Sequence, residues 1–145
     1  MATPLEWAYL AGLFDGEGSI SIGKRAIKKY PGVFSYRLEM LLTNTHLDSL
    51  YRIQKEIGGY VYVRKLVEPR RKPLGYIRWE NTRAVEILNE LLPYLKIKLA
   101  HAKLAIDFVQ TKTRTRLDGL KHVPQGMLEH FRREMLDLNG NMHRR

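Results

Sequence analysis

The chain has no cysteine, and this absence excludes several kinds of site. Without thiols it has no disulfide bonds, no thiolate zinc site and no cysteine nucleophile. The sequence also lacks an apolar run near the ~20 residues that a membrane-spanning helix needs. Its N-terminus (MATPLEWAYL) has neither the basic start nor the cleavage site of a secretory signal. We therefore expect a soluble intracellular protein, in the cytoplasm or an organelle, with no membrane partner.

Acidic residues are few compared with basic ones. Asp and Glu number 15, whereas Lys and Arg number 25, which gives a formal net charge of +10. A balance this basic favours a polyanionic partner, most simply nucleic acid. The alternative is a soluble protein that is basic for another reason, because charge by itself carries no specificity. With 145 residues, 44% of them hydrophobic, we predict a single domain, residues 1–145, with its own core.

The first helix is predicted from its start, its end and a stripe of small residues. Residues 3–6 (TPLE) form a helix start, because Thr can cap, Pro fits the first turn and Glu completes a capping box. Ala8, Gly12 and Gly16 lie four apart, on one stripe that lets another backbone approach closely. The helix should end near Asp15, because the glycines that follow favour a turn.

Two carboxylates, Asp15 and Glu17, stand at this predicted helix end, within the segment LAGLFDGEG (10–18). A carboxylate at a helix C-terminus faces the negative end of the helix dipole, where it is disfavoured. A bound cation offsets that cost, so the segment indicates a metal site. The alternative is that both acids merely end the helix.

Alternation of apolar and polar residues at period two predicts four strands, in two hairpins with one apolar and one polar face each. The strands are predicted at residues 19–25, 34–42, 60–66 and 76–80, with the valines of the third strand facing inward. Further helices are predicted at 45–57 (capped by Thr45), from Asn81 or Thr82 to 92, at 96–110, and from Pro124 to about 140, with an irregular segment at 111–123. The order predicts an α+β fold whose sheet has helices on one face only.

The polar faces of the four strands carry side chains suited to reading base edges in duplex DNA, where Arg pairs with guanine and Glu with cytosine. These residues are Ser21, Arg25, Arg37, Glu39, Tyr62, Arg64, Tyr76, Arg78 and Glu80. The two hairpin loops add cations suited to phosphates, namely Lys28, Lys29, Arg70, Arg71 and Lys72. The alternative is an ordinary solvated sheet face. With the two basic loops and the net charge, we favour nucleic acid.

The segment LAGLFDGEG resembles the motif of the LAGLIDADG homing endonucleases, and the order of elements matches the αββαββα core of that family. The resemblance covers roughly residues 5–110, including LPYLKIK at 92–98. It implies a four-stranded antiparallel, saddle-shaped sheet with helices on one face. The core would span about 4–110, followed by a C-terminal helical extension, 111–145, that matches the family poorly and could add DNA contacts or dimer surface.

The resemblance also implies the site residues. Glu17, where the family more often has Asp, would bind a divalent metal, together with the backbone carbonyl of Gly16. Asp15 would support the motif turn and the dimer. Asn44 and Lys98 would organise water around the scissile phosphate. The alternative for Lys98 is a surface lysine at a helix end, and His46 either joins this pocket or is a surface histidine.

One motif supplies only half of a two-acid site, so we predict a homodimer. Its interface would include Ala8, Ala11, Gly12 and Asp15, and its two-fold symmetry implies a nearly palindromic target. The resemblance implies an intron-encoded enzyme that breaks both strands of double-stranded DNA by metal-dependent hydrolysis. Mg²⁺ or Mn²⁺ would support cleavage and Ca²⁺ binding alone, without a small-molecule cofactor. The alternatives are an RNA maturase and a non-cleaving nucleic-acid-binding protein of the same fold.

Overall fold

The computed structural model describes residues 2–64, 72–117 and 124–143. Its elements are α1 (Pro4–Glu17), β1 (Gly18–Ala26), β2 (Phe34–Asn44), α2 (Leu47–Ile57), β3 (Tyr60–Arg64), β4 (Leu74–Glu80), α3 (Asn81–Leu91), α4 (Leu99–Leu117) and α5 (Gln125–His143). The predicted α+β class and the order of the elements are confirmed. None of the described helices combines the length and the apolar character needed to cross a membrane.

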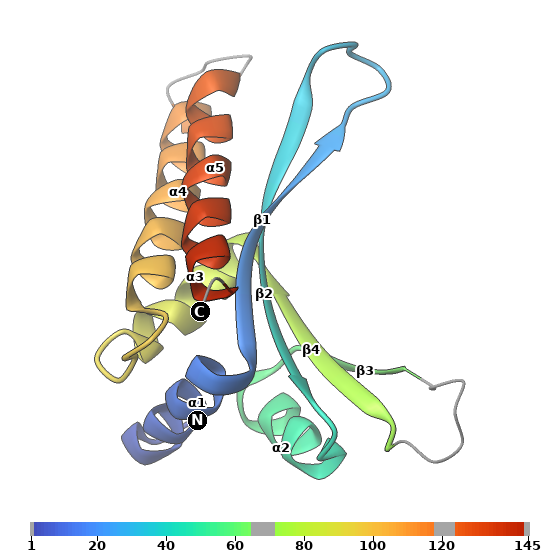
Figure 1. Ribbon diagram of the computed structural model, residues 1–145, viewed down its shortest axis with the longest axis vertical. Helices are drawn as coiled ribbons and strands as arrows, with labels where there is room; N and C mark the ends of the chain where they lie inside the picture. Colours follow the sequence, from blue (N-terminus) through green and yellow to red (C-terminus); the bar gives the residue numbers. More distant parts are fainter. Residues whose placement is uncertain (1, 65–71, 118–123, 144–145) are drawn as a thin grey trace.

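The four strands form one antiparallel sheet in the order β1-β2-β4-β3. Its two faces differ because successive side chains of a strand point to opposite sides. Ile20, Leu38, Met40 and Ile77 point to one side and are fully buried. The helices cover that side and leave the opposite face open, as Figure 1 shows. The predicted sheet with one apolar and one polar face is therefore confirmed.

One inward-facing valine departs from the prediction. Val61 is buried, but Val63 is 42% exposed, although alternation places both on the same face of β3. β3 is the outermost strand, and Val63 pairs with Gly75, which has no side chain to cover it. The position of the strand in the sheet, rather than the polarity of the residue, decides the exposure of Val63.

α1 begins as predicted and ends later. Its capping box is present, with the backbone N of Thr3 2.6 Å from Glu6 Oε2 and the backbone N of Glu6 3.3 Å from Thr3 Oγ1. The helix continues to Glu17, where the backbone N–H of Gly18 donates to the carbonyl of Phe14. A Cβ at Gly18 would lie 2.2 Å from the Phe14 ring. Only glycine therefore lets the chain pass so close to the helix on its way into β1.

α4 starts later and ends later than predicted. Its start is delayed because the side chain of Asp15 accepts the backbone N–H groups of Lys96 and Lys98 and holds this segment in a bend. Residues 111–117, predicted to be irregular, continue the helix. There Lys112 donates to the carbonyl of Tyr36 on β2, which holds this part of α4 against the sheet. Contacts distant in sequence therefore set both ends of the helix.

The other helix ends differ by smaller amounts. His46 rather than Thr45 caps α2, because its Nδ1 accepts a backbone N–H of the first turn. Asn81, predicted as a cap, lies at φ 46° and accepts the backbone N–H of Leu38, 3.1 Å away, with its Oδ1. α5 continues past its predicted end near 140.

The β1–β2 hairpin extends beyond the rest of the sheet. β4 pairs with β2 only from Glu39 to Asn44, so residues 34–38 of β2 have no strand on that side. We call residues 22–38, the part of the hairpin beyond this pairing, the arm. Figure 1 shows it rising beside α5 and away from β3 and β4.

Candidate metal and nucleic-acid site

The second acid of the motif, Glu17, is the last residue of α1, and its side chain is exposed. It forms no hydrogen bond or ion pair with the described part of the chain. The carbonyl of Gly16 is one of the last four in α1, and these have no partner within a helix. A carboxylate and a carbonyl are hard oxygen ligands of the kind that Mg²⁺ binds. Glu17 and Gly16 therefore fit a divalent ion.

These two residues do not form a complete metal site by themselves. Among residues 2–64, 72–117 and 124–143, no three His, Cys, Asp or Glu side chains lie where they could hold a metal together. Mg²⁺ needs few protein carboxylates, because it usually keeps waters or binds substrate phosphates as well. The remaining ligands of an ion at Glu17 would be of that kind, waters or the oxygens of a substrate phosphate.

Lys98 lies against the end of α1. Its Nζ donates to the carbonyl of Asp15, 2.8 Å away, and its backbone N–H donates to Asp15 Oδ1, 3.0 Å away. The side chain is only 5% exposed, so the alternative of a surface lysine is wrong. Burial lowers the pKa of Lys98, and the carboxylates of Asp15 and Glu17 act in the opposite direction. The structure thus brings the predicted lysine and the predicted metal ligand into electrostatic contact.

The carboxylate of Asp15 does not lie on a surface that a second copy could reach. Its Oδ2 accepts the backbone N–H of Lys96, 2.8 Å away, and its Oδ1 accepts that of Lys98. Asp15 is buried as a result. The expected support of the motif turn is present, but the side chain acts within one chain rather than at a dimer contact.

Asn44 lies across the sheet from the end of α1. Gly18 pairs with Leu42, so Asn44, at the end of β2, is close to the point where α1 meets β1. Its Oδ1 accepts the backbone N–H of His46, 2.9 Å away. The His46 ring is engaged with Ser49 as a helix cap, with Nδ1 2.6 Å from the Ser49 hydroxyl oxygen. The exposed His46 ring therefore caps the start of α2, which fits the alternative of a surface histidine.

His101 is a buried polar residue beside the site that was not among the candidates. It lies in the first turn of α4, three residues after Lys98, and is buried like it. Burial, and then the charge of Lys98, lower the pKa of His101, so its imidazole is neutral near pH 7. The spacing of three residues could have indicated that His101 lies close to Lys98.

The small residues of α1 do not all face the same way in the folded chain. A Cβ at Gly12 or Gly16 would meet nothing within 4 Å, so neither glycine is required by packing within the described chain. Ala8 is partly exposed on the same stripe. Ala11, also expected at a dimer interface, is 0% exposed because it points into the core. The expectation is wrong for Ala11, whose side chain offers a second copy no surface.

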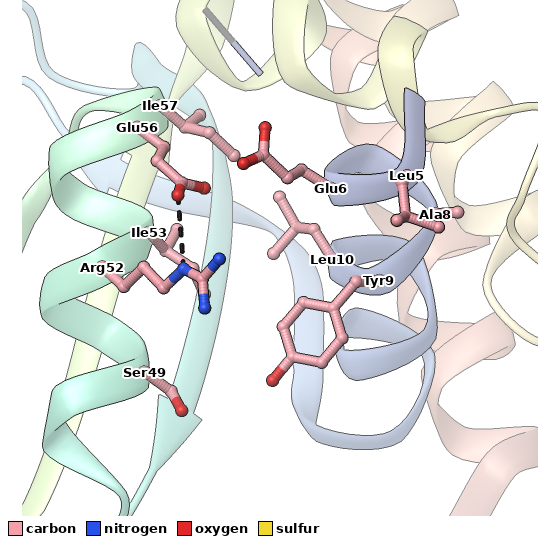
Figure 2. Close-up of a pocket in the computed structure, with 10 residues that line it drawn as sticks. All are labelled: Leu5, Glu6, Ala8, Tyr9, Leu10, Ser49, Arg52, Ile53, Glu56 and Ile57. Atoms are coloured by element: carbon pink, nitrogen blue, oxygen red, sulfur yellow. Dashed lines mark hydrogen bonds and ion pairs between the residues drawn. The ribbon is translucent and has the colours of Figure 1, made fainter. Parts of the chain in front are cut away.

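An apolar groove of about 460 Å³ lies beside this stripe, between α1 and α2. Leu5 and Tyr9, on its α1 side, are 80% and 61% exposed. Figure 2 shows Tyr9 and Glu6 projecting from α1 toward Arg52 and Glu56 of α2, which form an ion pair of 3.3 Å. The exposed side of α1 is therefore apolar over most of its length.

The predicted base-reading residues share the open face of the sheet, as the strand register requires. The register places Ser21 opposite Glu39, which in turn lies opposite Glu80. Two arginines connect these acids, with Arg37 Nη1 3.4 Å and Arg78 Nη1 3.6 Å from the Glu80 carboxylate. The structure therefore brings predicted residues of β2 and β4 into one charged cluster on the open face, with Ser21 of β1 next to it in the register.

Tyrosines form a second cluster on the same face. The Tyr62 and Tyr76 rings stack with centroids 5.1 Å apart, and Tyr60 meets Tyr62 edge-on at 4.8 Å. The Arg78 guanidinium lies 5.9 Å from the Tyr62 and Tyr76 centroids. Tyr60 was not among the candidates, although the alternation of β3 places it beside Tyr62. Arg64, the remaining candidate on β3, is exposed at the end of the strand.

The basic loops are only partly within the described residues. Arg25 is exposed near the tip of the arm, and Lys28 and Lys29 are exposed in the turn that follows. Lys72 is exposed just before β4. Arg70 and Arg71 lie outside the described residues. The four described cations of the arm and the second loop are therefore accessible to a partner.

Residues 10–114 match the family model described as LAGLIDADG endonuclease. A comparison with curated protein sequences finds no match.

Solved structures give a similar result. The homing endonuclease I-CvuI, crystallised with its target in the presence of Ca, is 27% identical, with a TM-score of 0.64 over 78% of this chain and 71% of that chain. A second structure of I-CvuI, with uncleaved DNA and Mg, has a TM-score of 0.70 at 23% identity over 92% and 82% of the two chains. The archaeal intron-encoded homing endonuclease I-Vdi141I, complexed with DNA, has a TM-score of 0.72 at 16% identity over 92% and 84%. The last two show the shared fold.

Proposed function

Because the chain belongs to the LAGLIDADG endonuclease family, we propose that it is an intron-encoded, site-specific enzyme that cuts both strands of duplex DNA by metal-dependent hydrolysis. The observation that carries the proposal is the exposed carboxylate of Glu17, at the point where α1 leads into the open face of the sheet. A catalytic carboxylate there lies at one end of a surface suited to DNA. Such an enzyme would act wherever its DNA target lies, in the cytoplasm or in an organelle.

The open face has the length and chemistry that duplex recognition needs. β1 starts next to Glu17 and has nine residues, so at ~3.3 Å per residue the arm reaches about 30 Å from the acid. At ~3.4 Å per base pair this distance spans about nine base pairs. Arg and Glu side chains on the face would read base edges, and the lysines of the turn would bind phosphates. The crystallised relatives bound to DNA support this assignment.

A homodimer would complete the site. Each glycine inside a helix costs about 1 kcal/mol relative to alanine, and no contact within the described chain requires Gly12 or Gly16. Close approach of a second α1 supplies a reason for both. The exposed Leu5 and Tyr9 extend this contact as an apolar surface. Two α1 ends would then bring two copies of Glu17 together on a nearly palindromic target.

Each residue of the site has a role in this proposal. Glu17 and the carbonyl of Gly16 would hold Mg²⁺ or Mn²⁺, which when bound stabilises the attacking and leaving oxygens of phosphodiester hydrolysis. Lys98 would place positive charge beside the scissile phosphate. The amide nitrogen of Asn44 would orient water. Ca²⁺ would support binding without cleavage.

The tyrosine cluster bears on the maturase alternative. Proteins that bind single strands offer open ring faces on which bases stack. Tyr62 and Tyr76 each turn one face toward the other ring, while Tyr60 and Tyr62 stay 64% and 44% exposed. The cluster alone therefore does not separate duplex DNA from RNA, and the family match carries the preference for DNA.

The test starts by selecting bound duplexes from a randomised DNA library in Ca²⁺, and it then measures cleavage of the selected target in Mg²⁺. The wild type should cut both strands. Glu17→Gln should bind the target and lose cleavage, because the amide is a poor replacement for an anionic metal ligand. Glu90→Gln, an exposed change on α3, is the matched control and should cut normally. Tight binding without cleavage by the wild type would leave a non-cleaving binder, and full cleavage by Glu17→Gln would refute the metal-ligand role.

A further inference from the structure

The arm leaves one edge of β2 without a strand. Backbone groups at every second residue of an antiparallel strand point to the same edge. At Phe34, Tyr36 and Leu38 they point away from β1, to the side where β4 has already ended. An unpaired edge of this kind leaves backbone donors and acceptors open and gives the strand no support from a neighbour.

Three side chains take the place of the missing strand. The N–H of Phe34 donates to Gln125 Oε1 of α5 at 3.0 Å, and the N–H of Leu38 donates to Asn81 Oδ1 at 3.1 Å. Between them, the carbonyl of Tyr36 accepts the ammonium of Lys112 on α4. Side chains from three helices thus bond three successive positions of the open edge. Their spacing along β2 is that of the ladder they replace.

Glu129 on α5 adds a second row of contacts, on the covered face of the arm. Its Oε2 accepts the Tyr36 hydroxyl at 2.7 Å and lies 3.1 Å from Lys24 Nζ. Lys24 pairs with Tyr36 across the two strands, so the two bonds hold both strands of the arm. Arg132 and Arg133 also bind Glu129, which fixes the carboxylate. Alternation places these contacts on the side opposite Arg25 and Arg37.

We propose that α5 and the end of α4 form a brace that sets the direction of the arm, so that Gln125 and Glu129 are positioning residues for DNA specificity without touching DNA. A short, two-stranded hairpin has little stability alone, and its angle to the rest of the sheet is free to vary. Fixing that angle fixes which base pairs Arg25 and Arg37 can meet. The inference rests on the proposed function, since it names what the C-terminal helices contribute to DNA reading.

The brace is tested with two variants that leave the open face unchanged. Glu129→Ala removes the acceptor for Tyr36 and Lys24, with Glu134→Ala, a surface change on the same helix, as control. Tyr36→Phe removes only the hydroxyl, with Tyr51→Phe on α2 as control. Hydrogen exchange of the free protein reports on arm amides. Selection from a randomised duplex library in Ca²⁺ reports base preference at each position of the target.

The backbone amide hydrogens of the arm should exchange several-fold faster in Glu129→Ala and Tyr36→Phe than in the wild type, and they should exchange at the wild-type rate in the two controls. Base preference should be lost at the outer positions of the target, which the arm contacts, and retained near its centre. Unchanged arm exchange in Glu129→Ala overturns the brace. An equal loss of preference at all positions overturns the role in specificity, because it reports general instability. If the wild type selects no DNA sequence, the proposed function fails, and the exchange measurement still decides whether α5 holds the arm.

Discussion

Asp15 and Lys98 are joined by two hydrogen bonds, and Lys98 donates both of them. The Asp15 carbonyl accepts the Lys98 ammonium at 2.8 Å, and the Asp15 carboxylate accepts the Lys98 backbone N–H at 3.0 Å. One residue of the motif therefore holds a distant lysine at the end of α1. The carbonyl lies at the negative end of the helix dipole, where a cation is favoured. This pair connects the motif helix to the turn before α4.

Replacing Asp15 with Asn should destabilise the fold. An amide offers one acceptor oxygen, so one of the two backbone N–H groups, of Lys96 or Lys98, loses its partner. Leaving such a group unpaired costs roughly 1–3 kcal/mol. Urea unfolding measures the change, with Asp107→Asn on the exposed side of α4 as control. Equal stability of the two variants would contradict the role assigned to Asp15.

Replacing Lys98 with Met should reduce cleavage while DNA binding persists. Methionine keeps the length and apolar stem of the side chain and removes only the buried ammonium. The Asp15 carbonyl then loses this donor, and leaving a buried acceptor unpaired costs roughly 1–3 kcal/mol, so binding in Ca²⁺ checks that the variant is folded. Cleavage in Mg²⁺ and binding in Ca²⁺ are compared with Lys103→Met, an exposed change on α4. Cleavage at the wild-type rate would remove Lys98 from the catalytic site.

Replacing Gly12 with Leu should weaken self-association without disturbing the monomer. The position opens onto free space within the chain, so a larger side chain meets no internal obstacle. It would keep two α1 helices from approaching closely. Analytical ultracentrifugation measures the dimer, with Gly140→Leu, a helical glycine in open space on α5, as the matched control. If the sedimentation of Gly12→Leu matches that of the control, the stripe is not the dimer contact.

Replacing Gly18 with Ala should destabilise the chain, whereas Gly140→Ala should not. A Cβ at Gly18 would lie 2.2 Å from the Phe14 ring, so the ring or the backbone must shift. Overpacking of this kind costs about 1–3 kcal/mol. At Gly140, a helical glycine on α5, a Cβ meets nothing, and alanine improves helix propensity. Urea unfolding of both variants should therefore give opposite signs, and equal signs would be inconsistent with this packing.

The link between Tyr36 and Glu129 should be visible in titration. Burial, and then the bond to Glu129, raise the pKa of Tyr36 from 10.0 to about 12. Its contribution to stability is complete below pH 10 and is lost as pH rises from 10 to about 12. The Tyr36 hydroxyl, followed by Lys24, lowers the pKa of Glu129 from 4.5 to about 2, so its contribution is lost as pH falls from 4.5 to about 2.

Ultraviolet absorbance of the tyrosinate form measures the Tyr36 pKa. In Glu129→Ala the last tyrosine to ionise should do so at lower pH, since the acceptor of the Tyr36 hydroxyl and its charge are both removed. A titration curve identical to that of the wild type would contradict the bond.

Features set by neighbours in the chain could be predicted. The capping box at Thr3 and Glu6 needs only four consecutive residues, and it is present. The open-face positions of Arg37 and Glu39 follow from alternation and register within one hairpin. Val63 has the same local signal as Val61, yet it is exposed, because its burial depends on what lies across the sheet.

The residues of the candidate site also differ in whether local sequence or packing decides their placement. The motif places Glu17 at the end of a helix, because spacing and glycines act locally. The burial of Lys98 and the inward direction of Ala11 depend on which elements pack on α1. No local pattern indicates that Gln125 binds Phe34, since 91 residues separate them.

Local sequence is enough to specify the helix that ends in an acid and the alternation of the strands, because each depends on residues close together in the chain. The excess of positive charge follows from composition alone. Tertiary structure decided which side of α1 is covered, where the Lys98 ammonium lies and how the arm is supported. Burial and pairing of this kind depend on surfaces brought together from distant segments. Both local sequence and packing act on Glu17. The motif puts it at the end of α1, and the packing around that helix leaves its carboxylate exposed beside a buried lysine.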